Sequence, residues 1–177
     1  MKYNGVEFDA IVATPCCGKS YLCDKYPDKF VDVDEVFLRC KYYVPENLSR
    51  AEIESTKGQR TFERQPAEGL AKRLHKKLDE YVAAGKTLIS APQPEAVEYL
   101  VKNNIKFAFL YYSKDMKAEF EKRMRDRGNP EKTIKAFVDL YDEYYEKDLR
   151  ENQSVLHYEF GADEYLEDII KKFGYKL

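Results

Sequence analysis

The segment from Ala13 to Ser20, which reads ATPCCGKS, constrains the fold of this chain more than any other stretch. It follows the apolar run Phe8 to Ala13, which has the length and composition of a buried strand, and it leads into Lys19 to Tyr26, which suits a helix. A glycine-containing turn between a strand and a helix presents main-chain N–H groups to a bound anion. We therefore expect a strand, an anion-binding loop and a helix in this order.

Apolar runs and helical patterns alternate along the rest of the chain. Strands that alternate with helices predict an α/β fold with a five-stranded, mostly parallel sheet and helices on both of its faces. Ligands of such sheets bind beyond the carboxyl ends of the strands, which is where Ala13 to Ser20 would lie. The other expected strands are Phe30 to Val33, Thr87 to Ala91, Phe107 to Tyr112 and Val155 to Phe160.

The expected helices carry their apolar residues at helical spacing. The region 35–65 has weak periodicity, and we expect a mobile helical insertion there that binds the second substrate. A helix is expected from Pro66 to Gly85, and another begins near Pro94. The first of these two has an apolar face made of Leu70, Leu74, Leu78 and Val82.

Three helices are expected in the last third of the chain. One ends at Gly128, and Asn129 and Pro130 then have the residue types of an N-cap and a first helical position. The last helix is expected from Tyr165 to Phe173. The core-facing residues of the first two are Met116, Phe120 and Met124, and then Ile134, Phe137, Val138, Tyr141 and Tyr145.

Length and charge limit the classes of protein that this chain can belong to. A chain of 177 residues fits one domain, so we expect a single domain over residues 1–177. The formal net charge of −2 argues against a chain-wide attraction to nucleic acid, although a local basic groove is compatible with it. The sequence has no apolar run near eighteen residues, so we expect a cytoplasmic protein with no membrane partner. The spacing of the four cysteines is not that of a zinc site, and reduced thiols are expected.

The loop matches the phosphate-binding pattern G-x-x-x-x-G-K-[ST], except that Ala13 replaces the first glycine. We expect Lys19 to bridge the outer phosphates of ATP and Ser20 to bind Mg²⁺. Cys16 stands where many such loops have a glycine, so either its backbone tolerates the turn or the loop is distorted. The alternative is a strand-to-helix turn that contains Gly-Lys-Ser by chance. The residues expected to contact the nucleotide are Thr14, Pro15, Cys16, Cys17, Gly18, Lys19 and Ser20.

Asp32 and Asp34 occupy alternate positions at the end of the second expected strand, so we expect both side chains on the same side. Asp32 would orient water on Mg²⁺, and Asp34 would position an acceptor hydroxyl or accept its proton. Taken alone, an Asp-x-Asp pair is more often a solvated strand end. The third strand ends in Ser90-Ala91-Pro92 and lacks an aspartate, so the Asp pair is the available metal ligand.

Two arginine pairs are candidates for binding negative charge. Arg123 and Arg127 lie four residues apart and share a helical face, whereas Arg125 points elsewhere, so the pair is expected to act in catalysis on the transferred phosphoryl group. Arg60 and Arg64 repeat this spacing and would bind an acceptor phosphate. The alternative for each pair is a solvated surface balanced by nearby glutamates.

The loop, the segment VDVDEVF and the segment KAEFEKRMRDRGN occur in the chain order of the P-loop nucleotide-kinase superfamily, which the sequence resembles. That superfamily includes nucleoside monophosphate, shikimate-type and polynucleotide kinases, and the small phage-encoded members are especially similar. The resemblance implies a P-loop kinase fold, ATP with Mg²⁺, and a helical lid at 114–130 that closes over the phosphates.

The resemblance leaves the acceptor open. Similar kinases hold an acceptor hydroxyl with the second aspartate, whereas monophosphate kinases hold an acceptor phosphate with arginines. We expect a small-molecule nucleotide acceptor, a (deoxy)nucleoside monophosphate, held by Asp34, Arg60 and Arg64. The first alternative is a hydroxyl acceptor, either a nucleoside, a small metabolite or a hydroxyl on DNA. The second is a nucleotide-binding regulatory protein without transfer chemistry.

Overall fold

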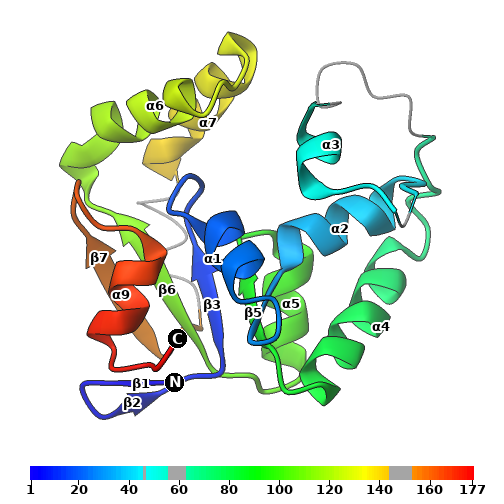
Figure 1. Cartoon of the computed structure of the whole chain (residues 1–177), viewed down its shortest axis with the longest axis horizontal. Coiled ribbons are helices and arrows are strands. Elements are labelled where there is room, and N and C mark those ends of the chain that lie inside the picture. Colours follow the sequence, from blue (N-terminus) through cyan, green and yellow to red (C-terminus); the bar gives the residue numbers. More distant parts are fainter. Residues whose placement is uncertain (46, 56–62, 144–152) are drawn as a thin grey trace.

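The computed structural model describes residues 1–45, 47–55, 63–143 and 153–177, which form an α/β fold around a five-stranded parallel sheet (Figure 1). The strand order is β4-β5-β3-β6-β7, and every neighbouring pair is parallel. The three central strands are near-continuous apolar runs, as expected for strands that are covered on both faces, whereas Leu156 to Glu159 of the last strand alternate between half-buried and exposed. They are β3 (Ala10–Ala13), β4 (Phe30–Asp32), β5 (Thr87–Ser90), β6 (Phe107–Tyr112) and β7 (Leu156–Phe160).

Alternate residues of β3 point to opposite faces of the sheet and enter two separate hydrophobic clusters. Ile11 and Ala13 pack with α1 (Lys19–Lys25) and α9 (Leu166–Lys172). Ala10 and Val12 pack with α2 (Val33–Lys41), α4 (Leu70–Ala83) and α5 (Pro94–Lys102). The expectation of a parallel sheet with helices on both faces is therefore confirmed.

A helical pair extends the first of these clusters beyond the sheet (Figure 1). It consists of a short 3₁₀ turn, η1 (Lys114–Met116), then α6 (Lys117–Asp126) and α7 (Glu131–Glu143). Phe120 and Tyr141 bring the two helices together, with ring centroids 5.2 Å apart. The expected core residues of this pair are buried or half-buried, and Tyr145 lies outside the described residues.

The first residues form a small antiparallel hairpin that the sequence reasoning missed. Its strands are β1 (Lys2–Tyr3) and β2 (Val6–Glu7), joined by Asn4 and Gly5, which both have positive φ. Asn-Gly is the residue pair typical of such a turn, so the signal was present in the sequence. Tyr3 lies against Phe173 of the first hydrophobic cluster, with ring centroids 4.3 Å apart.

Several predicted element boundaries differ from those of the structure, including the start of the first expected strand, which is Ala10, and the end of the third, which is Ser90. The helix expected from Pro66 begins at Leu70, because Gly69 takes a left-handed conformation and starts the helix there. With 14 residues α4 is the longest helix in the described ranges, and no helix in them is long and apolar enough to cross a membrane. The last strand begins at Leu156, one residue later than expected. The second expected strand ends at Asp32, because that residue caps α2.

The region 35–65 is helical in two of its parts. It contains most of α2 and all of α3 (Arg50–Ser55), while positions 46 and 56–62 lie outside the described residues. The end of this region lies beside the end of α2, where Tyr42 and Arg64 form an isolated antiparallel bridge. Figure 1 shows α3 above α2, on the side of the sheet away from α6 and α7.

The apolar face predicted for α4 is wrong at its last position, and this gives a stability test. Leu78 is 1% exposed, whereas Val82 is 42% exposed. We expect Leu78→Ala to lower the free energy of unfolding by about 2–5 kcal/mol, because it leaves a cavity in the core. Val82→Ala should cost less than about 0.5 kcal/mol. Urea unfolding of the two variants measures this, and equal losses would contradict the observed packing.

Candidate functional site

The loop Ala13–Ser20 connects the carboxyl end of β3 to α1 and contains two left-handed residues. Gly18 has φ +94° and caps α1, and Cys16 has φ +60°. The left-handed conformation costs a residue with a Cβ about 1 kcal/mol or more, so this turn must be held by its surroundings. The Cys16 carbonyl accepts a hydrogen bond of 2.9 Å from the Tyr112 hydroxyl, and the Cys17 carbonyl accepts one of 2.8 Å from the Leu166 N–H. Of the two possibilities left open for Cys16, its backbone adopts the turn.

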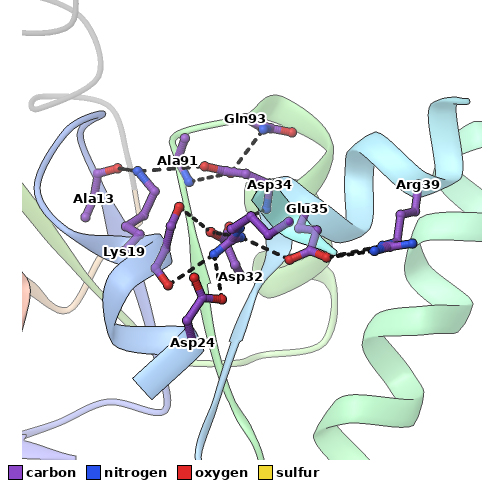
Figure 2. A network of polar contacts seen from close by, with 11 residues as sticks. Ala13, Lys19, Asp24, Asp32, Asp34, Glu35, Arg39, Ala91 and Gln93 are labelled. Carbon is purple, nitrogen blue, oxygen red and sulfur yellow. Dashed lines mark hydrogen bonds and ion pairs between the residues drawn. The ribbon is translucent and has the colours of Figure 1, made fainter. Parts of the chain in front are cut away.

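Lys19 is buried in the hollow of this loop. Its Nζ donates hydrogen bonds of 3.1 Å to the carbonyls of both Ala13 and Thr14, and it lies 3.7 Å from Asp34 Oδ2 (Figure 2). Burial by itself lowers the pKa of Lys19, but the Cys17 sulfur and the carboxylates of Asp34 and Asp32 raise it above its ordinary value. The lysine therefore remains charged although it is shielded from water.

The two aspartates lie near the loop, but not as alternate residues of a strand, so that prediction was wrong. Asp32 ends β4 and caps α2, accepting a hydrogen bond of 3.0 Å from the Asp34 N–H. Asp34 therefore lies in the first helical turn. The reason is local, because aspartate is among the strongest N-cap residues. Asp32 Oδ2 accepts a hydrogen bond of 3.1 Å from the Ser20 hydroxyl, so each aspartate contacts one loop residue.

Asp34 is held in place from the end of β5. Its Oδ1 accepts hydrogen bonds from the Ala91 N–H at 2.8 Å and from Gln93 Nε2 at 3.0 Å, which leaves Oδ2 facing Lys19 (Figure 2). Burial raises the pKa of Asp34, and the charge of Asp32 adds to this, while Lys19 and the Ala91 N–H oppose it. Gln93 was missed by the sequence reasoning, because a glutamine near the start of a helix carries no signal of this contact.

Arg50 at the start of α3 is the second residue that the sequence reasoning missed. Its guanidinium lies 2.6 Å from Asp32 Oδ2, 3.1 Å from Glu35 Oε2 and 3.2 Å from Asp24 Oδ1. It also donates to the Ser20 carbonyl at 3.1 Å. Burial by itself lowers the pKa of Arg50, but the three carboxylates raise it. No sequence motif joins residues that are 18 positions apart and meet only in the folded chain.

Two buried polar atoms next to this network lack a hydrogen-bond partner among the described residues. They are Thr14 Oγ1 in the loop and Gln93 Oε1 beside Asp34. Buried polar atoms of native proteins are nearly always paired with protein, water or ligand. Water or a polar ligand is therefore expected to pair with these two atoms.

Arg123 and Arg127 both act on the loop electrostatically. Burial raises the pKa of Cys16, and the charges of Arg127, Lys19 and Arg123 oppose that rise. Arg127 is exposed, whereas Arg123 is buried. As expected, Arg125 points elsewhere and pairs with Glu121 and Glu131.

The guanidinium of Arg123 joins three parts of the fold. It donates to the Tyr112 hydroxyl at 3.0 Å, to Glu119 at 3.1 Å and to the Ala162 carbonyl. It also stacks over the Tyr165 ring at 4.3 Å. Arg123 thus links α6 to the end of β6 and to the loop before α9, which is a structural task in addition to any catalytic one.

The other arginine pair is only partly visible. Arg64 is exposed, and its backbone pairs with Tyr42. Arg60 lies outside the described residues. The expected clamp on an acceptor phosphate therefore stays a prediction.

A cavity of about 320 Å³ opens directly beside the loop. It is lined by Gly18, Tyr21 of α1, and Tyr165, Glu167 and Asp168 of the start of α9. Both tyrosines are exposed, although Arg123 covers one face of the Tyr165 ring.

The described residues hold no cluster of three or more His, Cys, Asp or Glu side chains suited to a metal ion. The Ser20 hydroxyl and the Asp32 carboxylate do supply two neighbouring oxygens. Mg²⁺ typically binds through one or two protein oxygens and completes its shell with substrate phosphates and water. The residues present therefore fit Mg²⁺, which the phosphates of a nucleotide would hold more firmly.

No model of a known protein family matches this chain, and no curated protein matches it. Among solved structures, the chain is similar to an uncharacterized protein from Eubacterium ventriosum, with a TM-score of 0.47 and 17% sequence identity. The similarity covers 93% of this chain and 97% of the other. It carries no argument about function at this level, so the chemistry of the site rests on its own residues.

The contacts of Arg123 predict that it supports the fold, unlike its neighbour Arg125. Arg123→Ala leaves buried carbonyl and hydroxyl groups without their donor, which should lower the free energy of unfolding by about 2 kcal/mol or more. Arg125→Ala removes exposed ion pairs and should change it by less than about 0.5 kcal/mol. Chemical denaturation measures both, and a neutral Arg123→Ala would show that these contacts do not stabilise the protein.

Proposed function

We propose that this protein is an ATP-dependent phosphotransferase with a P-loop kinase fold, which moves the γ-phosphate of ATP to a nucleotide-type acceptor. The proposal rests on one observation above all, the buried Lys19 that its own loop holds in place beside Asp34. Burying an ammonium group is costly unless it is paired and hydrogen-bonded. Lys19 meets this condition through two loop carbonyls and Asp34, so the loop keeps a charged lysine at the position that would bridge the outer phosphates of a bound nucleotide.

The loop geometry supports polyphosphate as that ligand. Main-chain N–H groups of a loop with left-handed residues form a concave anion site, and a lysine at its centre can bridge the outer phosphates. The cavity beside Gly18 would take the rest of the nucleotide, because the exposed rings of Tyr21 and Tyr165 suit a nucleobase. Ser20 and Asp32 would hold Mg²⁺, which neutralises phosphate charge when it is bound.

Arg127 and Arg123 would stabilise negative charge on the transferred group, because both already act electrostatically on Cys16 of the loop. In this role α6 and the turn at Gly128 would form a lid over the phosphates. Arg127 is the better candidate for direct contact, since it is exposed whereas Arg123 is buried.

The acceptor is the open part of the proposal, and one observation favours a hydroxyl as a second candidate beside a nucleoside monophosphate. Asp34 Oδ1 is fixed by two donors and Oδ2 faces Lys19, an arrangement that can orient an acceptor hydroxyl and take its proton. A monophosphate acceptor would depend instead on Arg60 and Arg64. The hydroxyl could belong to a nucleoside, a small metabolite or DNA.

Nucleotide binding is tested through Lys19. At an ATP concentration 100 times its dissociation constant, Mg²⁺–ATP should stabilise the protein by about 2.7 kcal/mol, because it binds the native state alone. We expect Lys19→Ala to lose most of this gain. Lys25→Ala is the matched control, because it removes an exposed lysine of the same helix. Thermal unfolding with and without ATP measures the shift, and a full shift in Lys19→Ala would place the nucleotide elsewhere.

Catalysis is tested through Asp34 with a panel of nucleosides, DNA ends and nucleoside monophosphates. With a hydroxyl acceptor, Asp34→Asn should lower kcat by a factor on the order of 10² to 10⁴. A base acts when it is ionised, so wild-type activity should fall as the pH falls through the pKa of Asp34, which is raised above its ordinary value. This acidic limb should vanish in Asp34→Asn.

Asp28→Asn, at an exposed position, is the control for this experiment. Transfer to monophosphates that survives Asp34→Asn would favour the phosphate acceptor. ATP binding without transfer to any acceptor would favour a nucleotide-binding regulatory protein.

A further inference from the structure

The strongest concentration of charge outside the Lys19–Asp34 pair surrounds the guanidinium of Arg50. The carboxylates of Asp24, Asp32 and Glu35 converge on it from α1, β4 and α2. Figure 2 shows these three carboxylates close together, to the right of Lys19 in this view. Because three acids neutralise Arg50, it is poorly suited to binding an anionic substrate in this conformation.

The guanidinium also uses the oxygen that a metal ion would need. Arg50 Nη2 lies 2.6 Å from Asp32 Oδ2, and the Ser20 hydroxyl donates to the same oxygen at 3.1 Å. A second guanidinium nitrogen lies 3.1 Å from the Ser20 carbonyl. Arg50 therefore covers both residues that fit Mg²⁺, and two cations cannot share this oxygen at such distances without strong repulsion.

We propose that Arg50 is an internal cation that competes with a divalent metal ion for Asp32, so that metal binding at Ser20 and Asp32 displaces Arg50 and releases the start of α3. This rests on the metal site of the proposed function. Arg50 is then a positioning residue, because it sets when the metal can bind and where α3 lies.

The construction of α3 allows such a release. The helix is capped internally, because the Ser49 hydroxyl and N–H both donate to Glu52, at 2.6 and 2.7 Å. Ile53 is buried and keeps the helix attached to the fold. Loss of the Arg50 contacts would thus free the start of α3 without removing its cap or its apolar anchor.

The competition has a consequence for the order of binding. With Arg50 in place and no metal ion bound, one positive charge offsets part of the charge of the three carboxylates around it. When a metal ion takes over Asp32, Arg50 loses its shortest ion pair and keeps only the more distant carboxylates of Asp24 and Glu35, so it is better able to attract an anionic acceptor. Metal and nucleotide would therefore bind before the acceptor.

Direct titration with Mn²⁺ in the absence of nucleotide tests the competition. In the wild-type protein, Mn²⁺ can bind only the small fraction of molecules in which Arg50 is displaced, and this raises the apparent dissociation constant. We therefore expect Arg50→Gln to lower the Mn²⁺ dissociation constant by about tenfold. Arg39→Gln is the matched control, since Arg39 also pairs with Glu35 but does not contact Asp32. Adding Asp32→Asn to Arg50→Gln should abolish the gain. Free Mn²⁺ is measured by electron paramagnetic resonance.

Hydrogen exchange of the wild-type protein gives a readout that needs no variant to fold. Mn²⁺ should accelerate amide exchange in residues 50–55 and leave α5 unchanged. An Mn²⁺ affinity that does not respond to Arg50→Gln, or exchange in α3 that does not respond to Mn²⁺, would overturn the proposal.

ATP binding in EDTA separates this idea from the proposed function. If ATP binds through Lys19 while Arg50→Gln leaves Mn²⁺ affinity unchanged, the competition is wrong and the nucleotide site stands. If Mn²⁺ affinity rises as expected while ATP does not bind, the competition stands and the phosphotransferase proposal is wrong.

Discussion

The buried charge of Lys19 is the constraint on which the rest of the site depends. Lys19 is 6% exposed, so its ammonium group must be surrounded by hydrogen-bond acceptors. Two of these acceptors are carbonyls of the loop that carries the lysine. This fixes the backbone of Ala13 and Thr14 and draws Asp34 to within 3.7 Å. Asp34 in turn is held by Ala91, so one buried charge ties the ends of β3, β4 and β5 together.

A second layer of charge lies outside this pair and is built from different elements. Asp32 caps α2, accepts a hydrogen bond from Ser20 and forms an ion pair with Arg50. A single carboxylate therefore connects the start of α2, the loop and α3. Removing any cation from such a cluster leaves uncompensated negative charge in a partly buried place. The site is therefore expected to respond as a unit to metal ions, together with the start of α3, which Arg50 connects to Asp32.

On the opposite side of the loop, Arg123 joins α6 to Tyr112 and to the segment before α9. Tyr112 also donates to the carbonyl of Cys16, the residue with positive φ. The strained turn of the loop is thus supported by a chain of hydrogen bonds that begins on α6. In the proposed function, this chain of hydrogen bonds would connect the position of α6 to the geometry of the loop.

Sequence periodicity predicted the sheet and most helices, because buried parallel strands and amphipathic helices carry their burial in their own residues. It also placed Lys19, Ser20, Asp32 and Asp34 at one edge of the sheet, since they follow strand ends. It misplaced the start of α4, which the left-handed Gly69 sets, and the conformation at Asp34, which the N-cap Asp32 sets. These two signals are short and compete with longer apolar patterns.

By itself, the sequence determined the α/β class, the strand-loop-helix unit and the residue types that could bind phosphate. Only the tertiary structure decided that Arg50 pairs with Asp32, that Gln93 orients Asp34 and that Arg123 stacks on Tyr165. The physical reason is that periodicity reports burial along one element, whereas a charge pair depends on two elements meeting. The partners of a buried charge are set by the packing of the sheet and its helices. From the sequence alone, many other acidic and basic residues of this chain were equally plausible partners.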